Sequence, residues 1–345
     1  MKDKVLNALK GVLYPGFSRD IVSFGIIKNV EVRSGIAAID AEITTDNSQI
    51  IETLKKSIPG AAKSVAGIID VDLKFTVHKT SETGEVQNKN LAPNIKYIIA
   101  TTSGKGGVGK STISSNLAIS LAKKYDVGLL DADIYGPNIP TMMGIEGHPI
   151  TVNGDKKIVP IEVYNLKVVS IGNMVPQGKA IIWRGSLIHR AIQQLLGDVE
   201  WGKLDFLIVD LPPGTGDAQL TLAQSVPISA SIIVTTPQEV AMGDAIKAID
   251  MFKSLNVPIA GVIENMSYFL CPHCGERSDI FASNGGKKLS KKFDIPLLGE
   301  IPINLSIREG GDNGKPISTT DEDTIFDPIA EKLVKAVEEK NKRDI

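Results

Sequence analysis

The chain has 345 residues, of which 42% are hydrophobic, and its formal net charge is −2. This length favours one large domain and one small one, and the weak net charge gives no field that would favour nucleic acid as a partner. The amino-terminal end is polar and no long apolar run follows it, so neither a signal peptide nor a membrane span is expected. We therefore expect a soluble cytoplasmic protein that acts on neither nucleic acid nor membrane.

Residues 1–78 are predicted to form a small α/β domain. A helix at the start, a hairpin over residues 30–43, a helix over 49–57 that Pro59 ends and an alternating strand over 71–77 are the expected elements. None of them carries evident chemistry. The segment resembles the small domain found in iron–sulfur assembly factors, although it lacks the cysteine that some members carry after the second hairpin strand.

Residues 79–94 are polar, contain glycine and proline, and are predicted to be a linker. The rest of the chain, residues 95–345, alternates short apolar strands with helices. That order predicts a mostly parallel sheet with helices on both faces.

A glycine-rich stretch between a strand and a helix fits G-x-x-x-x-G-K-[ST], the phosphate-binding loop of P-loop NTPases. The predicted nucleotide-binding residues are Gly104, Lys105, Gly106, Gly107, Val108, Gly109, Lys110, Ser111 and Thr112. Glycines let the backbone turn its N–H groups toward an anion, and the positive end of the next helix faces the same point. Lys110 is expected to reach the β- and γ-phosphates, and the Ser111 hydroxyl to bind Mg²⁺.

Carboxylates follow two of the predicted strands. Asp210 comes after four apolar residues, the Walker B pattern, and is predicted to hold Mg²⁺ directly or through water. Asp133 follows the strand at residues 127–130. Both are expected at the carboxyl edge of the sheet, where ligands bind in open parallel sheets. A strand-ending aspartate that caps a turn is the plainer alternative.

Lys105 adds a second lysine to the loop, and K-G-G-V-G-K-S resembles the deviant Walker A motif of the family that contains MinD, ParA and the nitrogenase iron protein. That resemblance implies a P-loop NTPase fold of the MinD (SIMIBI) type and a lysine that reaches across a dimer to the partner's nucleotide. It also implies that Asp133 positions the attacking water, that Asn265 recognises adenine and that Pro302 packs on the base. Solvated charge and ordinary turn chemistry are the alternatives for these residues.

The chain has two cysteines, Cys271 and Cys274, in one C-x-x-C. A complete four-thiolate site needs four ligands, so two subunits would have to share one. Spacing alone leaves three interpretations open: a shared iron–sulfur cluster, a structural zinc that is shared or completed by His273 or His148, and a redox disulfide.

The string from Glu264 to Phe269 that leads into the cysteine pair resembles the Mrp/NBP (ApbC) family of iron–sulfur cluster carriers. The resemblance implies a homodimer, a [4Fe–4S] cluster bridging Cys271 and Cys274 of both subunits, ATP hydrolysis with Mg²⁺, and exchange with an assembly scaffold and apo client proteins.

Two other functions share some of these features. A MinD- or ParA-like positioning ATPase would carry a structural zinc at the cysteine pair. However, the carboxyl-terminal helix has short aliphatic residues that favour docking on the protein over insertion into lipid. An electron donor that resembles the nitrogenase iron protein would also hold a bridging cluster. The cysteines of that class are usually far apart in sequence, so the adjacent pair here disfavours it.

Overall fold

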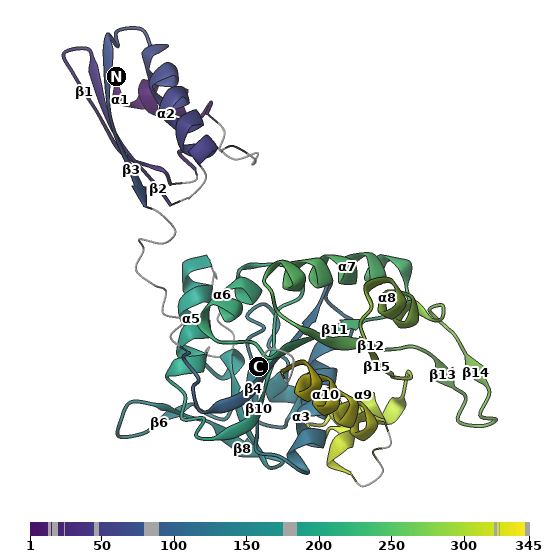
Figure 1. The fold of residues 1–345 in the computed structure, drawn as a ribbon. Coiled ribbons are helices and arrows are strands. Elements are labelled where there is room, and N and C mark those ends of the chain that lie inside the picture. Colours follow the sequence, from purple (N-terminus) through teal and green to yellow (C-terminus); the bar gives the residue numbers. More distant parts are fainter. Residues whose placement is uncertain are drawn as a thin grey trace. The chain divides into compact units, whose positions relative to one another are not determined.

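The computed structural model describes residues 1–12, 15, 20–23, 25–44, 48–78, 90–174, 185–320, 323 and 325–341. The chain forms two compact units, Met1–Gln87 and Asn88–Ile345 (Figure 1). The division falls within the segment expected to be a linker, most of which lies outside the described residues. Residues 45–47, which follow the second hairpin strand where some iron–sulfur assembly factors carry a cysteine, also lie outside the described residues.

The first unit is a three-stranded sheet with two helices. Its elements are α1 Lys2–Leu9, β1 Ile27–Arg33, β2 Ile36–Thr44, α2 Ser48–Lys63 and β3 Asp70–His78. β1 and β2 form the expected hairpin, which turns at Ser34 and Gly35, both with positive φ. β3 then pairs with β2 in parallel. The apolar face of the sheet packs with Leu9 of α1 and Leu54 of α2 in one core.

The prediction that Pro59 ends the second helix is wrong. α2 continues through Pro59 to Lys63. A proline inside a helix removes one backbone hydrogen bond. The apolar face nevertheless continues beyond it, because Leu54, Ile58 and Ala62 recur at helical spacing and all are 0% exposed. Burial of that face outweighs the local preference of the proline.

The second unit is built on an eight-stranded sheet with the order β15-β12-β11-β4-β10-β5-β9-β8. Every pairing in it is parallel except that of β8 with β9. The strands are β4 Ile95–Ser103, β5 Val127–Asp131, β8 Ile161–Val163, β9 Leu166–Ser170, β10 Leu204–Asp210, β11 Ala230–Thr235, β12 Ile259–Glu264 and β15 Leu297–Glu300. This is the predicted mostly parallel sheet, with one antiparallel edge strand that the sequence did not indicate.

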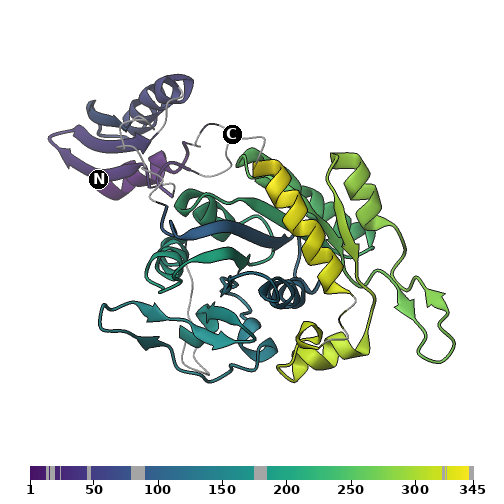
Figure 2. The same ribbon diagram turned by 60° about the horizontal axis from the view of Figure 1, so that its bottom comes forward.

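Helices cover both faces of the sheet (Figures 1 and 2). Successive residues of β10 point to opposite sides, so that Phe206 and Ile208 join one core while Leu207 and Val209 join the other. The first core also takes side chains from α3, α4, α9 and α10, and the second from α5, α6, α7 and α8. The helices are α3 Lys110–Ala122, α4 Ile139–Met142, α5 Gly185–Gly197, α6 Asp217–Ser225, α7 Glu239–Ser254, α8 Gly285–Phe293, α9 Leu305–Asp312 and α10 Phe326–Asn341.

Two short hairpins extend from this body. β6 Thr151–Val152 pairs with β7 Ile158–Val159, and β13 Phe269–Leu270 pairs with β14 Arg277–Ser278. Two 3₁₀ turns, η1 Ile171–Met174 and η2 Ile317–Thr319, complete the elements. Among the described residues, no helix combines the length and the hydropathy that a membrane crossing needs.

Candidate functional site

The phosphate-binding loop (residues 104–111) connects the central strand β4 to α3. Its backbone needs glycine at specific points. Gly107 and Gly109 have φ of 81° and 84°, a region that side chains rarely adopt. A Cβ on Gly104 would lie 2.1 Å from the backbone carbonyl carbon of Asp244 in α7. The Ser103 hydroxyl donates to the carbonyl of Lys105 at 2.9 Å and fixes the entry to the loop.

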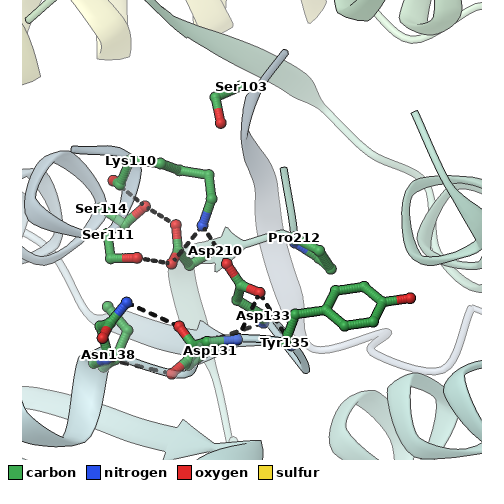
Figure 3. Close-up of polar contacts among 12 residues, drawn as sticks. Ser103, Lys110, Ser111, Ser114, Asp131, Asp133, Tyr135, Asn138, Asp210 and Pro212 are labelled. Carbon is green, nitrogen blue, oxygen red and sulfur yellow. Dashed lines mark hydrogen bonds and ion pairs between the residues drawn. The ribbon is translucent and has the colours of Figure 1, made fainter. Parts of the chain in front are cut away.

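Lys110, the first residue of α3, lies between two carboxylates (Figure 3). Its Nζ is 2.9 Å from Oδ2 of Asp210 and 3.3 Å from Oδ2 of Asp133. Burial alone would lower the pKa of the Lys110 ammonium, but the charges of Asp210 and Asp133 outweigh it and raise the pKa. The lysine is therefore a cation at the mouth of the loop, as transfer of a phosphoryl group requires.

Asp210, at the end of β10, is 0% exposed and fully bonded. Its Oδ2 accepts from the Ser111 hydroxyl at 2.6 Å, and its Oδ1 accepts from the Ser114 hydroxyl at 2.7 Å. Ser114 was not identified from the sequence. Its position one helical turn after Lys110, on the same face of α3, is the signal that could have found it.

Asp131 is the last residue of the neighbouring strand β5, and Asp133 follows two residues later. Asp133 lies beside Lys110, and burial raises the pKa of its carboxyl. Asp131 was missed: it is 0% exposed, accepts from the Ser170 hydroxyl at 2.8 Å and lies opposite Asp210 in the sheet register. Desolvation and the charge of Asp210 raise the pKa of Asp131 to about 8.

Two cavities meet at this loop. One, of about 250 Å³, is lined by the phosphate-binding loop with Lys105, Asp133 and Pro213. The second, of about 420 Å³, is lined by Asn265 and Pro302 among others. The residues that line both are Gly109, Thr112, Met142 and Met266. Except for Gly104, the predicted phosphate-binding and base-binding residues therefore line two neighbouring cavities that share part of their wall.

Asn265 makes a contact that the sequence did not predict. Its amide nitrogen donates to the carbonyl of Val108 at 2.8 Å, within the phosphate-binding loop. A Cβ on Gly109 would lie 2.2 Å from the same nitrogen. The amide of Asn265 thus supports the phosphate-binding loop through one of its N–H groups.

The cysteine hairpin (residues 269–278) lies on a different part of the unit. β13 and β14 flank the turn, and the N–H of Gly275 donates to the carbonyl of Cys271 at 2.8 Å. Cys271 is partly buried and Cys274 is exposed, and both are free thiols. The backbone N–H groups of Cys274 and His273, with the Cys274 side chain, lower the pKa of the Cys271 thiol. A thiolate is the form that binds a metal.

Within the described residues, no group of three or more His, Cys, Asp or Glu side chains is arranged to hold a metal ion. His148 and His273, the histidines considered as zinc ligands, are both exposed, and neither completes such a group with the cysteines. In the described part of one chain, the two thiols therefore have no third side chain of these types beside them to complete a metal site.

Comparison with known proteins agrees with this arrangement. The family model described as "NUBPL iron-transfer P-loop NTPase" matches residues 94–338, and that described as "Iron-sulfur cluster assembly protein" matches residues 2–73. The iron-sulfur cluster carrier protein of Helicobacter pylori is 44% identical over 96% of this chain and 90% of its own length. The iron-sulfur cluster transfer protein NUBPL of Dictyostelium discoideum is 47% identical over 77% of this chain and 84% of its own length.

Solved structures show the same fold. The nucleotide-binding protein of Archaeoglobus fulgidus, in complex with ADP, aligns with a TM-score of 0.59 and 38% identity over 67% of this chain and 93% of its own. The cell division ATPase MinD of Pyrococcus furiosus aligns with a TM-score of 0.52 and 22% identity over 71% of this chain and 99% of its own. This is a likeness of fold alone. This chain belongs to the family of iron-transfer P-loop NTPases.

Proposed function

We propose that this protein carries iron–sulfur clusters to apo-proteins and that binding and hydrolysis of ATP control the transfer. The observation that carries the proposal is the presence in one unit of a buried phosphate site and a solvent-facing pair of thiols. The relatives named as cluster carriers and the ADP complex of the Archaeoglobus protein support the two halves.

The phosphate site has the groups that hydrolysis of Mg²⁺-ATP needs. Lys110 neutralises the β- and γ-phosphates. Ser111 and Asp210 present hard oxygen atoms, 2.6 Å apart, of the type that Mg²⁺ prefers. Mg²⁺ bound there would neutralise phosphate charge. Asp133, held beside Lys110, orients the attacking water, and Asn265 and Pro302 receive the adenine.

A dimer completes both sites in this proposal. Lys105 lines the phosphate cavity of its own chain and, as in the MinD-type ATPases that its motif resembles, reaches the nucleotide of the partner. Cys271 and Cys274 of two chains supply the four thiolates of one [4Fe–4S] cluster. The cluster is cargo, and two ligands from each chain let it leave when the chains separate.

Cluster transfer tests the proposal directly. The reconstituted protein is mixed with an apo-ferredoxin, and the holo-ferredoxin that forms is followed by its spectrum, with and without Mg²⁺-ATP and with a strong iron chelator present. We expect transfer that the chelator does not intercept and whose rate depends on ATP. Transfer no faster than from free iron and sulfide would contradict the proposal. Co-sedimentation with liposomes or DNA would then favour a positioning ATPase.

A further inference from the structure

The cysteine hairpin belongs to a longer cysteine segment (residues 267–286), which leaves the sheet after β12 and returns at α8. Glu264, the last residue of β12, is 0% exposed and has no part in the chemistry described above. Its Oε1 accepts from the Ser267 hydroxyl at 2.6 Å, and its Oε2 accepts from the backbone N–H of Gly286. One buried carboxylate therefore holds both ends of the cysteine segment.

Two glycines make this approach possible. A Cβ on Gly285 would lie 2.9 Å from Oε2 of Glu264, and a Cβ on Gly286 would lie 3.0 Å from the Cβ of Glu264. The first turn of α8 can therefore reach the carboxylate only without side chains there. The positive end of the helix also favours a negative group at this point.

The same segment forms part of the wall of the base cavity. Met266, directly before the segment, and Phe281, within it after β14, both line the cavity of about 420 Å³. Phe281 is 38% exposed, although it is a large aromatic residue. Asn265, adjacent to Glu264, donates to Val108 of the phosphate-binding loop. At the end of β12, Asn265 therefore contacts the phosphate-binding loop, and Glu264 contacts the cysteine segment.

We propose that Phe281 contacts the nucleotide base and that Glu264 is the positioning residue that holds Phe281 there, so that base binding sets the placement of the cysteine pair. The inference rests on the proposed function for the choice of an adenine nucleotide as ligand. An aromatic ring in the wall of a base cavity provides a stacking surface. A base in contact with Met266 and Phe281 touches the residue just before the cysteine segment and a residue within it, and Glu264 ties the two ends of that segment together.

The first test measures nucleotide affinity by calorimetry on the iron-free protein with Mg²⁺ present. Phe281→Ala is expected to weaken ADP binding about tenfold, the size of a lost aromatic stack, while binding of pyrophosphate, which lacks the base, stays the same. Ile280→Ala is the matched control, because Ile280 is the exposed neighbour that does not line the cavity. An ADP affinity in Phe281→Ala equal to that of the unaltered protein would overturn the base contact.

The second test uses the cysteines as reporters. They are the two cysteines of the sequence, so the rate of thiol alkylation reports on this segment alone. ADP is expected to change the rate about fivefold, and pyrophosphate is expected to leave it unchanged. Glu264→Ala should abolish the ADP effect while ADP still binds. Glu264→Gln should retain it, because the amide can accept from Gly286 and donate to Ser267.

Ser267→Ala removes one of the two bonds and gives a smaller loss of the ADP effect, which keeps the test decisive if Glu264→Ala does not fold. Light scattering on the same samples separates this effect from a change in oligomeric state. A rate that ADP does not alter, or that pyrophosphate alters equally, would overturn the inference. Because iron-free protein is used, this result is independent of whether the cysteines bind a cluster.

Discussion

The phosphate site and the cysteine hairpin are built in opposite ways. Lys110 and Asp210 are 6% and 0% exposed, and each makes short contacts with its neighbours. Cys274 is exposed, and the hairpin that carries it is held by β13 and β14, which pair through two residues each. In the first site the charged groups are buried and bonded to one another within one chain, and in the second the thiols face solvent and need further ligands. This difference suits a fixed chemical step coupled to a cargo that must enter and leave.

Charge explains why the phosphate site must be so fully bonded. Asp131, Asp133 and Asp210 gather beside a single lysine, and buried charges are stable only when they are paired and hydrogen-bonded. The thiols face no such requirement, because solvent stabilises their charged form. Substitutions should therefore have large effects in the first site and small ones in the scaffold of the second.

Lys110→Ala is expected to have the largest effect on hydrolysis. It removes the cation that neutralises the phosphates, and loss of one such preorganised group lowers a rate about 10²–10³-fold. Phosphate release with Mg²⁺-ATP measures the loss. Lys124→Ala is the control, since its ammonium pairs only with exposed Glu331 and the change should leave the rate intact. Hydrolysis at the original rate in Lys110→Ala would contradict the assignment of the site.

Lys105→Ala tests whether the phosphate site is as complete in one chain as its geometry suggests. A cation supplied across a dimer is worth about 10³-fold or more in related phosphoryl transfers, so hydrolysis should fall steeply while ADP affinity changes little. Mixing the variant with Lys110→Ala protein should restore part of the rate if each chain supplies its lysine to the other. No restoration would place Lys105 in its own chain's site.

Asn265→Ala should have a moderate effect. The change leaves the carbonyl of Val108 without its donor and removes a group from the base cavity. A lost buried hydrogen bond costs about 1–3 kcal/mol, and the lower part of this range corresponds to a weakening of ATP binding of about tenfold. Equilibrium titration with ATP and with GTP measures both affinity and selectivity. An equal loss for the two nucleotides would assign Asn265 to loop support alone.

Arg277→Ala should have the smallest effect. Arg277 lies 4.2 Å from the ring centroid of Tyr268 and pairs with Asp279 at 2.9 Å on the exposed hairpin. Exposed contacts of this kind contribute about 1 kcal/mol or less. Hydrogen exchange should therefore accelerate within the hairpin and stay unchanged in α3. Exchange that accelerates in both would show that the two sites are not built independently.

The sequence predicted the parts of the phosphate site that follow from motif and topology. Lys110, Asp133 and Asp210 converge because carboxyl ends of parallel strands meet at one edge. It did not predict Ser114 or Asp131, whose roles depend on which face of α3 and which side of β5 turn toward Asp210. Such contacts follow from packing of the whole sheet rather than from a local pattern.

Long-range packing also explains the other differences. α2 passes through Pro59 because its buried face continues beyond it, and that face is visible only once the sheet of the first unit is formed. The sequence showed Glu264 as the end of a strand and gave no signal for Phe281. The cysteine segment brings Phe281 into the wall of the base cavity because it leaves the sheet after β12 and returns to Glu264, beside its own starting point.

The iron and sulfide content after anaerobic reconstitution tests the central claim most directly. The claim is that two chains, each supplying Cys271 and Cys274, hold one transferable cluster. We predict a brown protein with about four iron and four sulfide per dimer, and none in the variant with both cysteines changed to serine, while that variant keeps its ADP affinity. A colourless protein that retains zinc, or full iron binding without the cysteines, would contradict the account.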